Sequence, residues 1–244
     1  MEAKCTIKSN EVQGTLSEVV HMDKKLFIQA IGKYLSGVAL LFILLFAPAG
    51  TLKFWNAWLL MGILFIPMFI AGLVLMFKNP ELMRKRLNMK ETETEQKNVI
   101  LSGGLMFVCG FVVAGLNYRF DWVILPDWLA IAATIVFLLG YLLYAEVLRE
   151  NTYLSRTVEI QEGQKVIDTG LYGVVRHPMY LSTLLIFLSM PLILGSLFSF
   201  VIFLVYPVIM VKRIKNEEQV LEGGLEGYSD YKKRVKYRVI PFVW

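Results

Sequence analysis

The chain has few of the residues on which disulfide-rich folds and metal sites depend. Only two cysteines occur among its 244 residues, Cys5 and Cys109, and two cysteines cannot build a disulfide framework. The two histidines, His21 and His177, form no cluster with cysteines, so the sequence predicts no metal site. A glycine-rich strand-to-helix fingerprint for a nucleotide is also missing, and we therefore expect no Rossmann domain.

Charge is scarce as well. Charged residues make up 18% of the chain and hydrophobic residues 56%, whereas a soluble domain has about 25% and about 45–50%. The mean hydropathy is +0.56. These values exclude an intrinsically disordered chain and argue against a water-soluble enzyme. At about 20 residues per membrane helix, the chain has room for five or six such helices with short loops.

Long uncharged runs locate these helices. Five runs stand out: Tyr34–Leu52, Phe54–Phe77, Asn98–Tyr118, Trp128–Ala145 and Met179–Val211. The last has 33 residues, and one straight helix of that length would span about 50 Å against about 30 Å of hydrocarbon. Pro191 and the Gly195-Ser196 pair predict a break, which gives two helices near 178–193 and 197–215. We therefore predict an all-α polytopic integral membrane protein with about six transmembrane helices, the last two forming a hairpin.

No internal repeat or linker divides the sequence, so we predict a single membrane domain over residues 1–244. Residues 26–145 contain the N-terminal transmembrane helices, in which we find no functional motif. Residues 146–244 contain a polar loop, the helical hairpin and a polar C-terminal tail that we expect to form a cap.

The basic residues lie almost entirely on one side of the predicted membrane segments. Of the 25 lysines and arginines, 23 fall in the N-terminal stretch, the loops 78–98 and 149–178, and the tail from Lys212. Only Lys53 and Arg119 lie in the opposite loops. The positive-inside rule therefore predicts cytoplasmic termini and loops. Since no basic stripe is interleaved with exposed aromatic residues, we expect membrane lipids rather than nucleic acid as partners.

The loop before the hairpin contains the first polar cluster. Pro178 stands where a helix would begin, which leaves free backbone N–H groups near His177. Such a helix start binds anions, and Arg176 and His177 would add donors. In the alternative interpretation, these two residues simply mark the membrane interface.

A second polar cluster lies where the last helix leaves the membrane. Arg213 and Glu217 are four residues apart, so they share one helix face. Because the hairpin doubles back, we expect this face to turn toward His177. The alternative is a surface ion pair worth a few tenths of a kcal/mol. The basic, aromatic tail is typical of a segment lying on anionic lipid, and it would also cover this site.

Taken together, these residues resemble a known family. The matching residues are Gly170, Tyr172, Arg176, His177, Pro178, Tyr180, Arg213, Glu217, Glu218, Leu221, Gly227, Tyr228, Tyr231, Lys232, Arg234, Val235, Pro241 and Phe242. The pattern resembles the isoprenylcysteine carboxyl methyltransferase family, which is similar to membrane phospholipid methyltransferases, over roughly residues 146–244. Ser182 stands where the family often has glycine, a departure that bears on helix packing.

The resemblance implies an integral membrane methyltransferase that uses S-adenosylmethionine without a Rossmann domain. The residues it implies for cofactor binding are Gln164, Lys165, Val166, Ile167, Tyr172, His177, Pro178, Met179, Tyr180 and Glu217. Arg213 is implied to bind the substrate, and Arg213 and Glu217 to be the catalytic residues. A further loop contact is implied at Glu159 or Gln161.

The expected substrate is a lipophilic or prenylated acceptor from the bilayer, with an isoprenylcysteine-like carboxylate. A carboxylate is ionised near pH 7 and requires no base, and Arg213 would hold it. An aminophospholipid or other lipid amine must instead lose a proton, for which Glu217 or Glu218 is the candidate base.

Two other classes stay open. One is a reductase of the sterol type, which would bind a nicotinamide nucleotide. The other is a transporter or scaffold without enzymatic activity, although the uncharged runs contain no charges that would mark a transport pathway. The sequence carries no indication of the oligomeric state.

Overall fold

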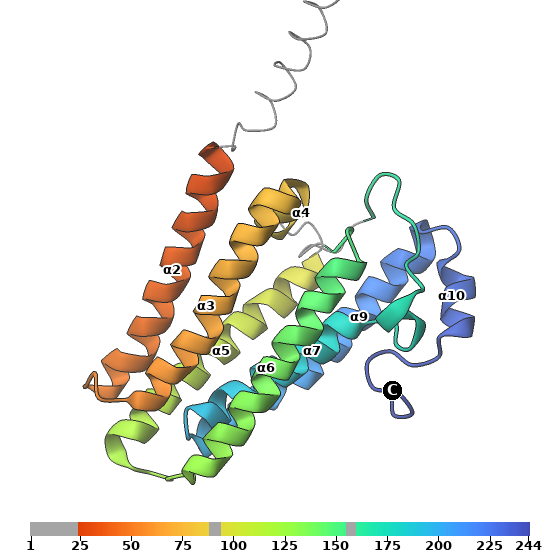
Figure 1. The fold of residues 1–244 in the computed structure, drawn as a ribbon. Coiled ribbons are helices and arrows are strands. Elements are labelled where there is room, and N and C mark those ends of the chain that lie inside the picture. The colour runs from red at the N-terminus through yellow and green to blue at the C-terminus, as the bar shows by residue number, and fades with distance from the viewer. Residues whose placement is uncertain (1–23, 88–93, 155–159) are drawn as a thin grey trace, which may run out of the picture. The chain divides into compact units, whose positions relative to one another are not determined.

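The computed structural model describes residues 24–87, 94–154 and 160–244 (Figure 1). The chain divides into two compact units, residues 1–37 and 38–244. The described part of the first unit is the beginning of helix α2 (Lys24–Ala49). The rest of α2 and all later elements belong to the second unit, which contains every predicted site residue.

Every regular element in the described ranges is a helix. After α2 follow α3 (Trp55–Lys78), α4 (Pro80–Leu87), α5 (Thr94–Phe120), α6 (Asp127–Glu150), the 3₁₀ turn η1 (Gly170–Gly173), α7 (Pro178–Ile193), α8 (Leu197–Phe203), α9 (Val205–Gly224) and α10 (Tyr228–Arg234). The predicted all-α class is confirmed.

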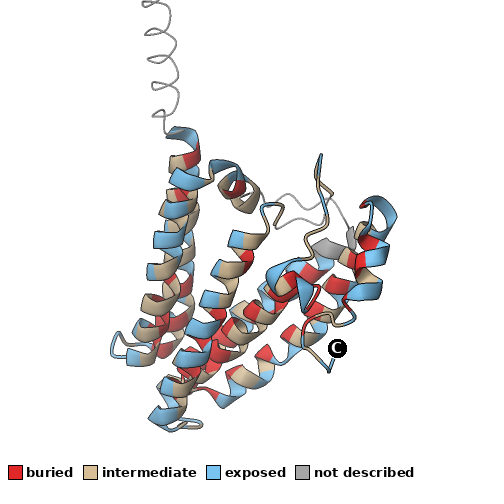
Figure 2. Cartoon of the chain, turned by 45° about the vertical axis from the view of Figure 1, so that its right-hand side comes forward, coloured by how far each residue is buried: buried red, intermediate tan, exposed pale blue. Residues whose placement is uncertain are grey.

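The helices include five stretches that are long and apolar enough to cross a membrane. These are Lys24–Ala49, Trp55–Lys78, Asn98–Phe120, Asp127–Glu150 and Leu197–Gly224. Helix α7 is shorter, with 16 residues. Large apolar side chains such as Phe77, Leu101 and Leu142 are exposed, and Figure 2 shows exposed residues along the long helices. Exposed apolar side chains of this kind suit contact with lipid. Within the described residues, the predicted polytopic fold thus has five stretches long enough to span a membrane, and α7, expected as a sixth, is a shorter apolar helix.

The break predicted in the last apolar run lies between α7 and α8. Gly195 adopts φ +71°, a conformation that glycine reaches without strain. The Ser196 hydroxyl then accepts the backbone N–H of Ser199 and caps the start of α8. The predicted helix 178–193 therefore has the bounds of α7.

A second break divides the helix predicted near 197–215. Helix α8 ends at Phe203, and α9 begins at Val205 and continues to Gly224. Pro207 has no N–H to donate to the Phe203 carbonyl four residues earlier, so a continuous helix would lose this bond. The predicted single helix is thus two helices, and the second is longer than expected.

Helix α6 packs closely along α7, and one glycine permits this (Figure 1). A Cβ atom at Gly140 would lie 2.9 Å from Ile186 Cγ1 and 3.1 Å from both Leu185 Cβ and the Ser182 carbonyl oxygen. Ser182 is itself fully buried at this contact, and its hydroxyl donates to the Met179 carbonyl at 2.6 Å. Ser182, the residue that departs from the family pattern, therefore lies at the contact between α6 and α7, as expected.

Gly140→Ala is expected to destabilise the protein by about 1 kcal/mol or more, because the α7 backbone cannot move away from the new methyl group without repacking. Gly62→Ala in α3 is the matched control, since no atom lies within 4 Å of a Cβ there. This control should be neutral or stabilising by up to about 1 kcal/mol through helix propensity. Thermal unfolding in detergent measures both variants, and equal stabilities would contradict the close packing.

Candidate functional site

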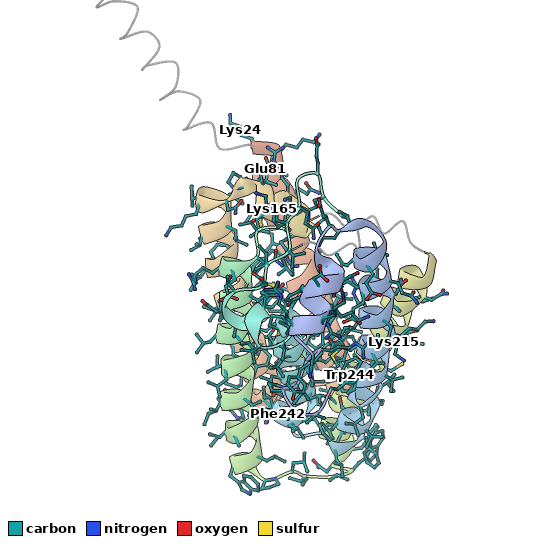
Figure 3. The ribbon with its side chains drawn as sticks, turned by 90° about the vertical axis from the view of Figure 1, so that its right-hand side faces the viewer. Lys24, Glu81, Lys165, Lys215, Phe242 and Trp244 are labelled. Atoms are coloured by element: carbon teal, nitrogen blue, oxygen red, sulfur yellow. The ribbon has the colours of Figure 1, made fainter. Side chains whose placement is uncertain are left out.

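A cleft opens where the loop after α6, the start of α7, the end of α9 and α10 meet. Its cavity volume is about 110 Å³. Its walls are formed by Asn151, Tyr153, Leu154, Gln164, Lys165, Val166, Ile167, Tyr172, Arg176, His177, Met179, Tyr180, Arg213, Glu217, Val220, Leu221, Leu225, Tyr228 and Tyr231. Figure 3 shows this side of the molecule, with Lys165 labelled on the loop.

A hydrogen-bonded chain joins α7 to α9 in the cleft. The Tyr180 hydroxyl donates to Glu217 Oε2 at 2.6 Å, and Arg213 Nε donates to the same phenol oxygen at 3.0 Å. Arg213 and Glu217 are one turn apart on α9 and so reach the same partner. His177 Nδ1 lies 3.9 Å from Glu217 Oε1. The face of α9 that contains Arg213 and Glu217 thus turns toward His177, as we expected from the predicted hairpin.

The carboxylate of Glu218, only 2% exposed, holds three segments together. Arg176 donates from Nε to Oε1 at 2.8 Å, and its Nη2 lies 2.8 Å from the same oxygen. Arg238 Nε donates to Oε2 at 2.9 Å, and His177 Nε2 lies 3.3 Å from Oε1. We call these four residues the Glu218 clasp. It ties α9 to the residues before α7 and to the C-terminal tail.

The backbone of the tail reinforces this clasp. The N–H groups of Arg176 and His177 donate to the carbonyls of Tyr237 and Arg238 at 2.9 and 2.8 Å. The Nη1 of Arg176 donates to two further tail carbonyls. Of the donors predicted for a bound anion, the Arg176 side chain and the His177 N–H are therefore used by the protein itself.

Tyr172 anchors the end of the loop to the helices on both sides. Its hydroxyl accepts a hydrogen bond from Asn151 Nδ2 at 2.9 Å, and its carbonyl accepts the Tyr231 hydroxyl at 2.8 Å. The neighbouring Leu171 N–H donates to the Glu150 carboxylate at 3.0 Å. These contacts fix the loop between α6 and α10, so that its middle part forms one wall of the cleft.

The middle of the loop is organised by its own side chains. Gln164 Oε1 accepts the Gln161 N–H at 2.9 Å, and Gln161 Nε2 donates to the Tyr153 carbonyl at 2.6 Å. Gly163 adopts φ +69° between them, a turn conformation that favours glycine. The turn places the following residues, Lys165 to Ile167, along the cleft.

Three phenols of the cleft stay neutral at physiological pH. Burial raises the pKa of Tyr172, Tyr228 and Tyr231 well above the usual range. A neutral phenol donates its proton in a hydrogen bond, as Tyr231 does toward Tyr172. The buried Tyr228 hydroxyl has no hydrogen-bond partner among the described residues.

The residues that the resemblance implied for the site line the cleft, except Pro178 and the candidate loop contact Gln161. Pro178 is fully buried and does not line it, because it occupies the first position of α7. Glu218 was a candidate base for an amine acceptor. Its carboxylate is instead buried and bound in the Glu218 clasp, so it does not take this role. Gln161 lies in the loop, and Glu159 lies outside the described residues.

Several residues of the cleft were not among the predicted site residues, although Leu221, Tyr228 and Tyr231 belong to the family pattern. They are Asn151, Tyr153, Leu154, Val220, Leu221, Leu225, Tyr228 and Tyr231. Helical spacing from Arg213 and Glu217 points to Val220 and Leu221, which follow on the same face of α9. No local pattern points to Asn151, whose place is set by the fold around Tyr172.

Sequence comparison finds known proteins that are similar to part of the chain. Residues 128–225 match the family model described as phospholipid methyltransferase. A curated relative, Delta(14)-sterol reductase TM7SF2 of Mus musculus, is 34% identical over 91 residues. That stretch covers 36% of this chain and 22% of the reductase, so the chain matches about a fifth of the relative's length.

A solved structure supports the fold along nearly the whole chain. The eukaryotic intramembrane Ras methyltransferase ICMT (isoprenylcysteine carboxyl methyltransferase) matches with a TM-score of 0.57 and 18% identity, over 95% of this chain and 86% of the other. At this identity the match shows the fold. The resemblance found in the sequence is confirmed: the chain is a multi-pass membrane protein with the fold of this methyltransferase, and its C-terminal part carries the phospholipid methyltransferase pattern.

Glu218→Gln is expected to destabilise the protein by about 3 kcal/mol, because it leaves the buried Arg176 guanidinium without its counter-charge. Glu217→Gln is the matched control on the next residue. Its side chain is 26% exposed, so loss of its charge should change stability by less than about 1 kcal/mol. Thermal unfolding of both purified variants provides the measurement. A Glu218→Gln protein as stable as Glu217→Gln would show that the clasp does not hold the fold.

Proposed function

We propose that the protein is an integral membrane methyltransferase that uses S-adenosylmethionine to methylate a carboxylate on a lipophilic, isoprenylcysteine-like acceptor at the cytoplasmic membrane face. The observation that carries the proposal is the chain from Arg213 through Tyr180 to Glu217, in a cleft whose opposite wall is the loop at residues 164–167. The family match over residues 128–225 and the shared fold support the methyltransferase class.

The cleft fits the chemical character of S-adenosylmethionine. One wall is apolar, where Val166 and Leu221 pack against the cluster containing Leu225, Tyr228 and Tyr231. Another wall is charged and contains Arg213 and Glu217. The cofactor likewise combines a flat adenine with a charged sulfonium and amino-acid part, and when bound it supplies an electrophilic methyl group.

The residues that would hold the cofactor are those of the loop and of the two helix faces around it. They are Gln164, Lys165, Val166, Ile167, Tyr172, His177, Met179, Tyr180 and Glu217, with Pro178 behind them as the start of α7. The Glu217 carboxylate offers a negative partner to a positively charged cofactor. The Glu218 clasp keeps His177 and the start of α7 in place beneath it.

Arg213 is the residue we assign to the acceptor. A guanidinium binds a carboxylate through two charge-assisted hydrogen bonds and so fixes its orientation. The Tyr180 hydroxyl accepts the Nε proton of Arg213 and thereby positions its side chain. The acceptor is already ionised near pH 7, so the protein has to orient it and exclude water rather than remove a proton.

The cytoplasmic orientation rests on the charge asymmetry of the sequence. The loop before α7 and the tail, which together form the cleft, belong to the side with 23 of the 25 basic residues. A soluble cofactor would enter from that side, and a lipophilic acceptor would enter from the bilayer. The cleft at the end of the hairpin is where the two would meet.

A reductase acting on a lipophilic substrate is a second candidate. The identity of 34% over 91 residues with the mouse sterol reductase favours it. Such an enzyme would bind a nicotinamide nucleotide in the same cleft. The two candidates differ in their cofactor, so binding measurements with the two cofactors separate them.

The purified wild-type protein is expected to bind S-adenosylmethionine in isothermal titration calorimetry. Arg213→Ala should retain this binding and lose turnover by roughly 10- to 100-fold, the effect of one hydrogen bond to a charged group. His177→Ala should instead weaken cofactor binding. Lys233→Ala is the control, because its partner Asp230 and Lys233 are both exposed on α10. No binding by the wild-type protein would disprove the methyltransferase proposal, and unchanged turnover in Arg213→Ala would remove its substrate role.

The type of acceptor is expected to show in the methylated product. Transfer of a radiolabelled methyl group from the cofactor to membrane lipid extracts or a prenylcysteine should yield a base-labile ester. A lipid amine, as the phospholipid methyltransferase match would suggest, yields a base-stable product. Label that survives base treatment, and is lost in Glu217→Gln, would replace the carboxylate acceptor by an amine with Glu217 as its base.

A further inference from the structure

One polar group in the cleft is left without a partner. Tyr228 lines the cleft and is only 4% exposed, and its hydroxyl makes no hydrogen bond with any described residue. Buried hydroxyls are nearly always paired, since an unpaired one destabilises the folded protein. In the wall of a ligand cleft, such a group indicates a hydrogen bond that the bound ligand completes.

The surroundings of Tyr228 restrict what that ligand part is. Leu225, Tyr231 and Val235 form a buried cluster with it, and Val166 and Leu221 pack against this cluster. The ligand part must therefore be apolar over most of its surface. Burial raises the pKa of the Tyr228 phenol, with further contributions from Glu218 and Glu217, so the hydroxyl is protonated and donates. The ligand must present a hydrogen-bond acceptor.

The two requirements exclude the other ligand parts expected in this cleft. A hydrocarbon chain of a lipid has no acceptor and would leave the hydroxyl unpaired. A carboxylate or phosphate is a poor fit beside Tyr228, because it would lose its hydration against the apolar cluster, Arg176 is already paired with Glu218, and Glu217 and Glu218 add negative charge. A flat heteroaromatic base satisfies both, because its faces are apolar and its ring nitrogens accept hydrogen bonds in the ring plane.

We infer that Tyr228 is a specificity-determining residue of the cleft, whose hydroxyl donates a hydrogen bond to a ring nitrogen of the adenine base of the bound cofactor. The inference rests on the proposed function in that it takes the cofactor to be an adenine nucleoside. It holds for S-adenosylmethionine and for a nicotinamide adenine nucleotide alike, since both contain adenosine. No bond is made or broken at Tyr228, which selects and orients the cofactor.

Tyr228→Phe separates this role from a structural one. The variant removes only an unpaired hydroxyl, so the ligand-free protein should unfold at the same temperature as the wild type or higher. Its affinity for S-adenosylhomocysteine, measured by calorimetry, should fall roughly tenfold, the effect of one hydrogen bond.

Tyr231→Phe is the matched control three residues away. Its hydroxyl donates to the Tyr172 carbonyl at 2.8 Å, so its removal leaves a buried acceptor unpaired and should lower the unfolding temperature. Tyr231→Phe should therefore lose stability, whereas Tyr228→Phe should lose affinity for S-adenosylhomocysteine. A Tyr228→Phe protein that is less stable and binds S-adenosylhomocysteine with unchanged affinity would overturn the inference.

Analogues of the ligand identify the partner atom. Among the 1-deaza, 3-deaza and 7-deaza forms of S-adenosylhomocysteine, one should bind the wild-type protein roughly tenfold more weakly and bind Tyr228→Phe without any further loss. The nitrogen that is missing from this analogue is then the atom that accepts the hydrogen bond from Tyr228. If each analogue loses the same affinity in both proteins, Tyr228 does not bind the adenine, and the inference is wrong.

A parallel titration with NADPH distinguishes this inference from the proposed function. If the wild-type protein binds NADPH and not S-adenosylhomocysteine, the methyltransferase proposal fails, while a roughly tenfold weaker NADPH affinity in Tyr228→Phe still supports the role of Tyr228. If S-adenosylhomocysteine binds equally to both proteins, only the inference fails. Binding of neither ligand to the wild-type protein would overturn both.

Discussion

The buried carboxylate of Glu218 determines how the parts of the site are placed. Arg176 precedes α7 and Arg238 belongs to the tail, and both donate to this one side chain on α9. The rotation of α9 about its axis is thereby fixed, and with it the direction of Arg213 and Glu217 toward Tyr180. A buried ion pair contributes little net stability compared with apolar packing, but its geometry is demanding, because an incomplete set of hydrogen bonds is severely destabilising. The Glu218 clasp therefore fixes the position of α9 relative to the start of α7 and the tail.

Two adjacent carboxylates on α9 have different roles because of their positions on the helix. Successive residues are rotated by about 100°, so Glu217 and Glu218 point to different surroundings. Glu218 faces the start of α7 and the tail, and its side chain is 3% exposed. Glu217 faces the cleft, where Tyr180 donates to it and its side chain is 26% exposed. Local sequence cannot distinguish the two, yet one holds the fold and the other is exposed to a ligand.

Signals that act over a few residues were sufficient to predict most of the long helices. Pro178 and Gly195 gave the bounds of α7, because proline and glycine act on the backbone where they stand, whereas Pro191 lies inside α7. The break at Leu204 was missed, since Pro207 is compatible with either a kinked helix or a new one. The Glu218 clasp joins residues 20, 41 and 42 positions apart, and no periodicity connects such distant residues. The site residues came from the family resemblance, and their roles stay predictions, although the fold does bring them to one cleft.

The arrangement of the cleft indicates which kind of reaction the protein is equipped to support. Glu218 is fully engaged, and burial keeps Tyr172, Tyr228 and Tyr231 as neutral phenols. The remaining charged pair is Arg213 and Glu217, which are joined through one phenol hydroxyl, since Arg213 donates to it and it donates to Glu217. Such a pair can place an anionic acceptor and a cationic donor next to each other, and their charges are neutralised when the methyl group moves. Proton transfer would instead use Glu217 Oε1, because Tyr180 donates to Oε2. Under the proposed function, methylation of a carboxylate would use this pair without proton transfer, whereas methylation of an amine would add a proton that Glu217 has to accept.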